Sequence, residues 1–78
     1  MRRLPLARAL HPRGGTAYLV TRPDGQRWMF IVDWIREGEV YCRRFLKRGQ
    51  TAECRGLLRM KLPTWRSAVR KALREARG

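Results

Sequence analysis

Three segments of the chain combine β-branched and aromatic residues with short turn-forming sequences between them. They are Thr16 to Arg22 (TAYLVTR), Arg27 to Arg36 (RWMFIVDWIR) and Val40 to Arg48 (VYCRRFLKR). The intervening PDGQ and EGE sequences, and GQ after the third segment, favour tight reversals. The pattern predicts three strands that form an antiparallel meander.

The middle segment is apolar on both of its predicted faces. Alternation of side chains places Trp28, Phe30, Val32 and Trp34 on one face, and Met29, Ile31, Asp33 and Ile35 on the other. Because a strand with one wet face would be polar at every second position, we expect this strand to be central and covered on both sides. A helix can cover one face. A dimer partner, the Leu4 to Leu10 segment or another protein are the alternatives for the second.

The segment from residue 51 to 62 (TAECRGLLRMKL) fits two periodicities. With a period of two, Leu58, Met60 and Leu62 face inward, as in a fourth strand. With a period near 3.6, Cys54, Leu57, Leu58 and Leu62 share a helical face. We favour the strand.

An amphipathic helix is predicted for the end of the chain. Pro63 disfavours helical geometry at Leu62, and Thr64 is a suitable N-cap. The apolar positions then repeat with helical spacing at Trp65, Ala68, Val69, Ala72, Leu73 and Ala76. The opposite side is basic, with Arg66, Arg70, Lys71, Arg74 and Arg77. The helix dipole gives a structural reason for the basic residues of the last turn.

These elements predict an α+β fold, an antiparallel three- to four-stranded β-meander followed by one C-terminal amphipathic helix packed on the sheet. Residues 1–15 contain two prolines, two glycines and four arginines without periodicity. We interpret residues 1–15 as a flexible basic N-terminal arm whose leucines can dock on the domain, and residues 16–78 as a single domain. We expect each of the three tryptophans to belong to the core.

The charge distribution is strongly asymmetric. The chain has 19 Lys and Arg against 6 Asp and Glu, a net charge of +13. Residues 43–78 carry twelve basic and two acidic groups, whereas residues 1–42 carry seven and four. A GC-rich genome would favour Arg over Lys, but it does not explain the shortage of acids. Such an excess destabilises a compact chain unless an anionic partner relieves it, and nucleic acid is the commonest such partner.

Two groups of basic residues are the predicted phosphate contacts. The strand-and-loop group is Arg43, Arg44, Lys47, Arg48, Arg55, Arg59 and Lys61. The helix group is Arg66, Arg70, Lys71 and Arg74. Arg43 and Arg44 alternate to opposite faces of their strand, so one of them is expected to neutralise Asp33, a carboxylate within an apolar strand. The strand-and-loop group has the weaker structural reason for its charge, and so it is the main evidence for a polyanionic partner.

The order of three antiparallel strands and then a helix, from Thr16 to Arg77, is similar to that of small DNA-binding domains of the AP2 type and of phage integrase arms. The similarity is one of element order, without a shared motif. It implies a sheet that lies in the major groove, with bases contacted by outward residues such as Arg27, Arg36, Arg43 and Arg44.

Catalysis and metal binding are poorly supported by the residues present. The six carboxylates form no evident acid–base pair, and Cys42, Cys54 and His11 lack the close spacing of a structural zinc site. We therefore expect no enzyme activity, no metal and no cofactor. We also expect no secretory signal and no membrane span, and hence a cytoplasmic protein whose two cysteines are reduced, unless they lie across from each other in the sheet.

The functional hypothesis is a small, basic nucleic-acid-binding protein that contacts the phosphate backbone, with homodimerisation through the second apolar sheet face as an option. The alternative is a phage or mobile-element modulator or inhibitor that binds an acidic protein or a nucleic-acid-processing complex. The sequence does not distinguish DNA from RNA, and it gives neither the sequence specificity nor the pathway.

Overall fold

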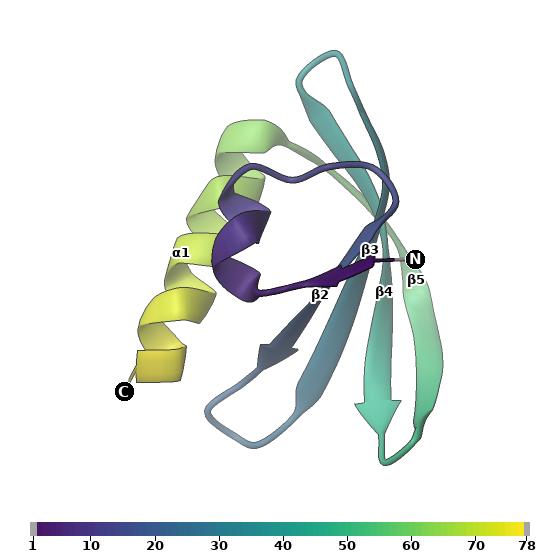
Figure 1. Ribbon diagram of the computed structural model, residues 1–78, viewed down its shortest axis with the longest axis vertical. Helices are drawn as coiled ribbons and strands as arrows, with labels where there is room; N and C mark the ends of the chain where they lie inside the picture. The colour runs from purple at the N-terminus through teal and green to yellow at the C-terminus, as the bar shows by residue number, and fades with distance from the viewer. Residues whose placement is uncertain (1, 78) are drawn as a thin grey trace.

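One mixed sheet of five strands and one C-terminal helix make up the fold (Figure 1). The structure is a computed structural model, and it describes residues 2–77. The expected α+β class with a final helix is confirmed, although the sheet has one strand more than expected. The elements in chain order are β1 (Arg2–Leu4), the 3-10 helix η1 (Leu6–Leu10), β2 (Thr16–Thr21), β3 (Arg27–Arg36), β4 (Glu39–Arg48), β5 (Thr51–Lys61) and α1 (Leu62–Arg77).

The strands follow the chain order from β1 to β5 across the sheet. Strands β2 to β5 form the expected antiparallel meander, and β3 is central. The additional strand β1 pairs in parallel with β2, with Arg2 opposite Thr16 and Leu4 opposite Tyr18. The sheet is therefore mixed and not purely antiparallel. A three-residue strand ahead of Pro5 is too short to produce a periodic pattern, so the sequence did not reveal it.

The N-terminal segment, predicted to be a flexible arm, contains β1 and η1 and packs against α1. Ala9 is fully buried, and its carbonyl oxygen accepts a hydrogen bond of 2.7 Å from the indole Nε1 of Trp65. The three leucines of this segment pack against the core cluster. The segment thus occupies the α1 side of the sheet and not the second sheet face. Its flexibility stays a prediction.

A β-bulge at Asp33 changes which way the end of β3 faces. Val32 pairs with Cys42 but Trp34 pairs with Tyr41, so Asp33 is an extra residue without a partner in the register. A bulge reverses the alternation of side chains beyond it. The expected face assignment therefore holds up to Val32 and is wrong for Trp34, which lies on the opposite face and is 50% exposed.

The segment after β4 is strand β5, as we favoured, and the helical alternative for it is wrong. The register between β4 and β5 shifts next to Gly56, whose φ of 111° is a conformation that glycine adopts easily. Helix α1 begins at Leu62, so the predicted N-cap at Thr64 is wrong. Pro63 lies in the first turn, where its missing N–H would have no intrahelical partner, and the Leu62 N–H donates to the Gly38 carbonyl oxygen at 2.9 Å.

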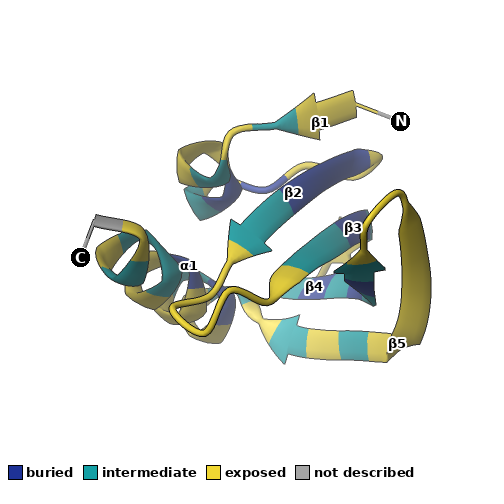
Figure 2. Ribbon diagram, turned by 90° about the horizontal axis from the view of Figure 1, so that it is seen from below, coloured by how far each residue is buried: buried dark blue, intermediate teal, exposed yellow. Residues whose placement is uncertain are grey.

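The core lies between α1 with η1 and one face of the sheet (Figure 2). It consists of Ala9, Tyr18, Val32, Val40, Cys42, Trp65 and Val69. Trp65 contacts Tyr18 and Phe30 edge-on, with ring centroids 6.4 Å apart in both pairs. Within residues 2–77 no helix covers the second sheet face, so cover of that face of β3 by a partner stays a prediction.

Candidate nucleic-acid interface

Most arginines of the strand-and-loop group are paired with carboxylates. Arg43 donates three hydrogen bonds of 2.8–3.2 Å to both oxygens of Asp33, which confirms the expected neutralisation of this acid. The other three pairs are Arg59–Glu39 at 2.7 Å, Arg48–Glu53 at 3.3 Å and Arg55–Glu53 at 3.2 Å. These four arginines have structural roles, and their charge is partly compensated.

Arg44 is the member of this group that faces α1. Its guanidinium carbon lies 5.3 Å from the ring centroid of Trp28, within the range of a cation–π interaction. One terminal nitrogen of the guanidinium donates to the Arg55 carbonyl oxygen at 3.3 Å, and its Nε is buried without a hydrogen-bond partner among the described residues. Arg44 therefore cannot share a phosphate-binding surface with Arg43, which lies on the other face. The remaining members, Lys47 and Lys61, form no ion pair with the described residues.

The helix group divides over two sides of α1. Arg66, Arg70 and Arg74 are spaced four residues apart and so form a stripe along the helix. Arg66 marks the side next to η1, because its Nε donates to the Leu10 carbonyl oxygen at 2.9 Å. Arg70 and Arg74 are exposed and form no ion pair with residues 2–77. From the sequence, the strand-and-loop group was expected to have fewer structural partners for its charge than the helix group. The structure shows the opposite, because four arginines of the strand-and-loop group form ion pairs and Arg70 and Arg74 form none within residues 2–77.

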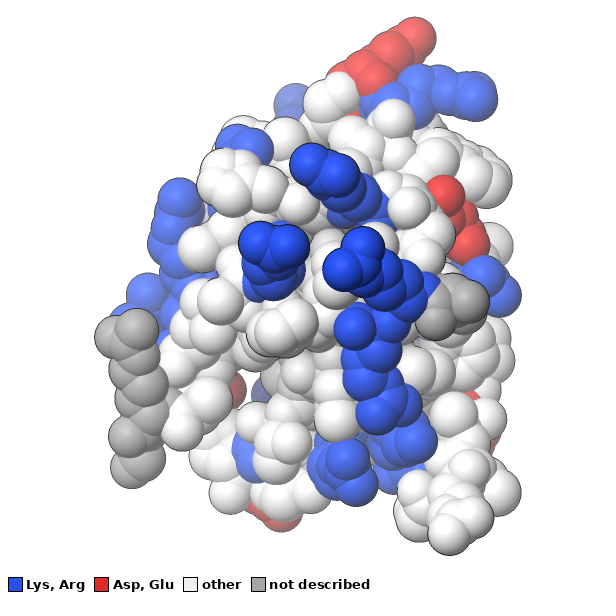
Figure 3. Space-filling model, viewed as in Figure 1, with Lys and Arg blue, Asp and Glu red and all other residues white. Residues whose placement is uncertain are grey.

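The N-terminal edge adds basic side chains that sequence reasoning did not include among the contacts. Arg2, Arg3, Arg8 and Arg13 are all exposed, and η1 lies against α1. Figure 3 shows lysines and arginines spread over the face where β1 and η1 lie in front, with acidic side chains mostly toward the periphery. The charge distribution along the sequence pointed instead to residues 43–78, which carry twelve basic and two acidic groups. The leucines at positions 4, 6 and 10 were the signal that this segment docks on the domain.

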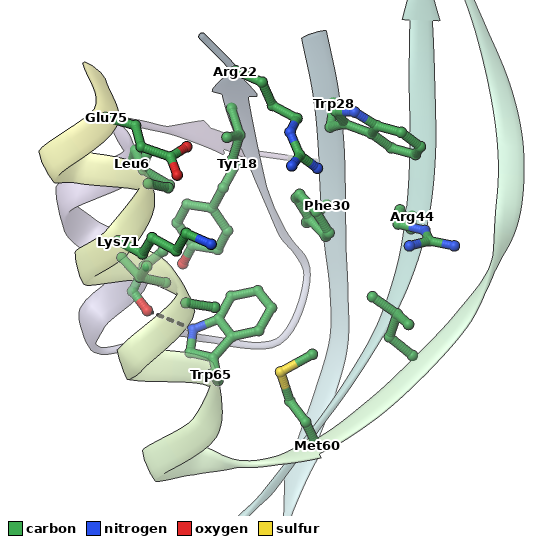
Figure 4. Close-up of a pocket in the computed structure, with 16 residues that line it drawn as sticks. Leu6, Tyr18, Arg22, Trp28, Phe30, Arg44, Met60, Trp65, Lys71 and Glu75 are labelled. Carbon is green, nitrogen blue, oxygen red and sulfur yellow. Dashed lines mark hydrogen bonds between the residues drawn. The ribbon is translucent and has the colours of Figure 1, made fainter. Parts of the chain in front are cut away.

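A groove of about 300 Å³ separates α1 from the middle of the sheet (Figure 4). Its lining is mainly apolar and includes Trp28, Phe30, Met60 and Trp65. Charged side chains also line it, namely Arg22 and Arg44 from the sheet side and Lys71 and Glu75 from α1. The groove therefore brings together two of the predicted contacts, Arg44 and Lys71, with Arg22, which was not predicted.

The three tryptophans, all expected in the core, have three different environments. Trp65 is 5% exposed and belongs to the core, as expected. Trp28 is half-buried and lines the groove. Trp34 stacks at a tilt on Tyr41 on the open sheet face, with ring centroids 5.7 Å apart, and Leu57 on that face is 78% exposed. The open face therefore presents apolar side chains to solvent.

The two cysteines are both free, and they do not face each other in the sheet. Cys42 lies opposite Leu58, whereas Cys54 lies opposite Phe45. Burial raises the pKa of the Cys42 thiol to about 11, and the nearby charge of Asp33 contributes in the same direction. A buried thiol with this pKa is a poor nucleophile at neutral pH. Within residues 2–77, no group of three or more His, Cys, Asp or Glu side chains is placed to hold a metal ion.

Comparison with known proteins identifies no relative. The chain matches no protein-family model, and neither the curated proteins nor the solved structures gave a significant match. Among the helices of residues 2–77, none has the length and apolar character needed to cross a membrane.

Proposed function

We propose that the protein binds nucleic acid through its phosphate backbone. The observation that carries this proposal is the set of exposed arginines without an ion pair among residues 2–77, namely Arg70 and Arg74 of α1 and the arginines of the N-terminal segment, whose η1 lies against α1. Side chains of this kind displace condensed counterions from a polyanion, and the release of those ions drives association. The lysines of the strand-and-loop group, Lys47 and Lys61, extend the positive field to the sheet.

The test is a salt-titrated fluorescence anisotropy assay with labelled duplex DNA, single-stranded DNA and RNA. Affinity should fall steeply between about 50 and 200 mM salt, and the slope of log affinity against log salt is about −0.9 for each duplex phosphate engaged. The double variant Arg70→Gln, Arg74→Gln should reduce that slope by about 1.8. Affinity independent of salt for all three nucleic acids would refute the proposal.

The matched control is the double variant Arg48→Gln, Arg59→Gln, which removes the same formal charge. These two arginines are 64% exposed at the side chain, but each is already paired with a glutamate. We expect it to reduce the slope by clearly less than the helix variant does. Equal reductions would mean that net charge, and not the α1 stripe, determines binding.

The open sheet face supports a second candidate function, the binding of a protein partner that is acidic or part of a nucleic-acid-processing complex. The supporting observation is the exposure of Trp34 and Leu57 on a face that no described element covers. A partner recovered after nuclease treatment, and lost with Leu57→Asp, would favour this function. Loss of every partner on nuclease treatment would favour nucleic-acid binding.

A further inference from the structure

The groove between α1 and the sheet is lined in a way that suits an aromatic ligand with negative charge. Trp28 and Phe30 provide aromatic surface, and the Arg44 guanidinium lies over the ring of Trp28. Its volume of about 300 Å³ is at the lower end of the range for small-ligand sites, which is about 300–1,000 Å³. Three cations, Arg22, Arg44 and Lys71, line it against the single acid Glu75. An apolar groove with this excess of cations fits a flat aromatic group attached to phosphate.

We propose that the groove holds one unpaired nucleobase of a bound strand, with the flanking phosphates next to Arg22 and Lys71. This inference rests on the proposed function and adds to it a preference for single-stranded segments. Bases of single strands commonly stack on aromatic side chains and on arginine guanidinium planes. In Figure 4, Arg22 and Lys71 reach toward the groove from its opposite walls, so phosphates on both sides of one base can be contacted.

Arg44 supplies a further reason for a ligand at this place. Its buried Nε has no hydrogen-bond partner among residues 2–77, which is an unfavourable state for a charged donor. A small rotation of the guanidinium toward the groove would let this N–H donate to a base carbonyl oxygen or ring nitrogen while the stack on Trp28 is kept. A base within a duplex reaches such a site only after it leaves the helical stack, which costs energy. The groove thus favours single strands, whereas the α1 stripe contacts any nucleic acid.

The experiment compares an intact labelled single strand with the same strand carrying abasic positions, which keeps every phosphate and removes the bases. Stacking of one base contributes about 1–3 kcal/mol, equivalent to about a 5- to 150-fold difference in affinity. We therefore expect the abasic strand to bind at least about fivefold more weakly, with the same dependence on salt. This comparison uses the unmodified protein, so it does not depend on the folding of a variant.

Two variants then locate the effect. Ala68 lines the groove and is exposed, so Ala68→Phe fills the groove without removing a core contact. Ser67 is the exposed neighbouring residue outside the lining, which makes Ser67→Phe the matched control. Ala68→Phe should abolish the difference between intact and abasic strands and leave abasic binding unchanged, whereas Ser67→Phe should preserve the difference.

Three outcomes would overturn the inference. Equal, salt-dependent binding of intact and abasic strands would reject the base site and leave the phosphate-binding function in place. Salt-independent binding to all strands would reject both. Saturable binding of decanoate, blocked by Ala68→Phe and unaccompanied by any preference for intact strands, would assign the groove to an apolar anion instead.

Discussion

The ion pair between Asp33 and Arg43 allows a direct test of whether a paired arginine stabilises the fold. It joins the bulge of β3 to β4 through three hydrogen bonds, and the two side chains are 23% and 41% exposed respectively. Hydrogen bonds to charged groups contribute about 1.5–3 kcal/mol, whereas fully exposed ion pairs contribute about 0.2–1 kcal/mol. Because this pair is half-buried and has good geometry, we expect a coupling energy of about 1–2 kcal/mol.

The coupling energy is measured with a double-mutant cycle of Asp33→Asn and Arg43→Gln, in which urea denaturation at neutral pH and moderate salt gives the free energy of unfolding of each protein. A domain of this size loses about 4–8 °C of Tm per kcal/mol, so loss of the coupling should lower the Tm of Arg43→Gln by about 4–16 °C in thermal unfolding. Arg27→Gln is the control, because Arg27 lies exposed on the same sheet face and forms no ion pair within residues 2–77. This substitution should change stability by about 0.5 kcal/mol or less. A coupling energy below about 0.3 kcal/mol would refute the reasoning.

The same variant separates a structural arginine from a phosphate contact. Arg43 was predicted to contact phosphate, but its guanidinium already donates to Asp33. Arg43→Gln should therefore leave the salt dependence of nucleic-acid binding nearly unchanged. A decrease of about 0.9 in the slope would show that Arg43 contacts phosphate despite its ion pair.

Three further predictions concern tryptophan and cysteine side chains. Trp65→Phe removes the donor to the Ala9 carbonyl oxygen and should lower the free energy of unfolding by at least about 1–3 kcal/mol in urea denaturation. The control Trp34→Phe changes an exposed side chain and should lower it by about 0.5 kcal/mol or less. Similar losses in the two variants would contradict the assigned hydrogen bond. Cys54 is exposed and should react quickly with a thiol reagent at a pH of about 8, while Cys42 should react only on unfolding. Folding raises the pKa of Cys42 from 9.0 to about 11, so the stability that its protonated thiol contributes is present below pH 9 and is lost as the pH rises toward 11. The loss of stability at alkaline pH should therefore be smaller in Cys42→Ala than in the unmodified protein. Equal losses in both proteins would show that other groups cause it.

Those parts of the fold that depend on local patterns could be predicted from the sequence. The limits of β3 follow from the turn sequences on either side of it, and the presence and apolar face of α1 follow from apolar positions at helical spacing, although its start at Leu62 does not. The partner of Asp33 could also be anticipated, because a carboxylate in an apolar strand requires a cation on a neighbouring strand. Each of these features is specified by a residue together with its immediate neighbours in the sequence or on the adjacent strand.

Features that depend on distant contacts could not be predicted. The bulge at Asp33 leaves no mark in the alternation of β3, and yet it moves Trp34 to the opposite face. Strand β1 exists because residues 2–4 meet β2, and its own sequence carries no strand pattern. Which arginines remain unpaired depends on where the three acids Asp33, Glu39 and Glu53 lie across the sheet. The groove arises from the position of α1 relative to the sheet, which no local pattern specifies.

The hydrogen bond from Trp65 to Ala9, which spans 56 residues of the chain, also determines when the protein can finish folding. The hairpins of β2 to β5 bring together residues close in sequence and can form early, and β1 can pair with β2, but η1 lacks its contacts with α1 until the ribosome has made Trp65. At usual rates of synthesis, the interval between completion of β4 and of Trp65 is about 1–3 s. During that interval the sheet face that carries Tyr18, Val32 and Val40 lacks the cover of α1. Nascent or truncated chains that stop before α1 should therefore be the species most prone to aggregation and most in need of a chaperone.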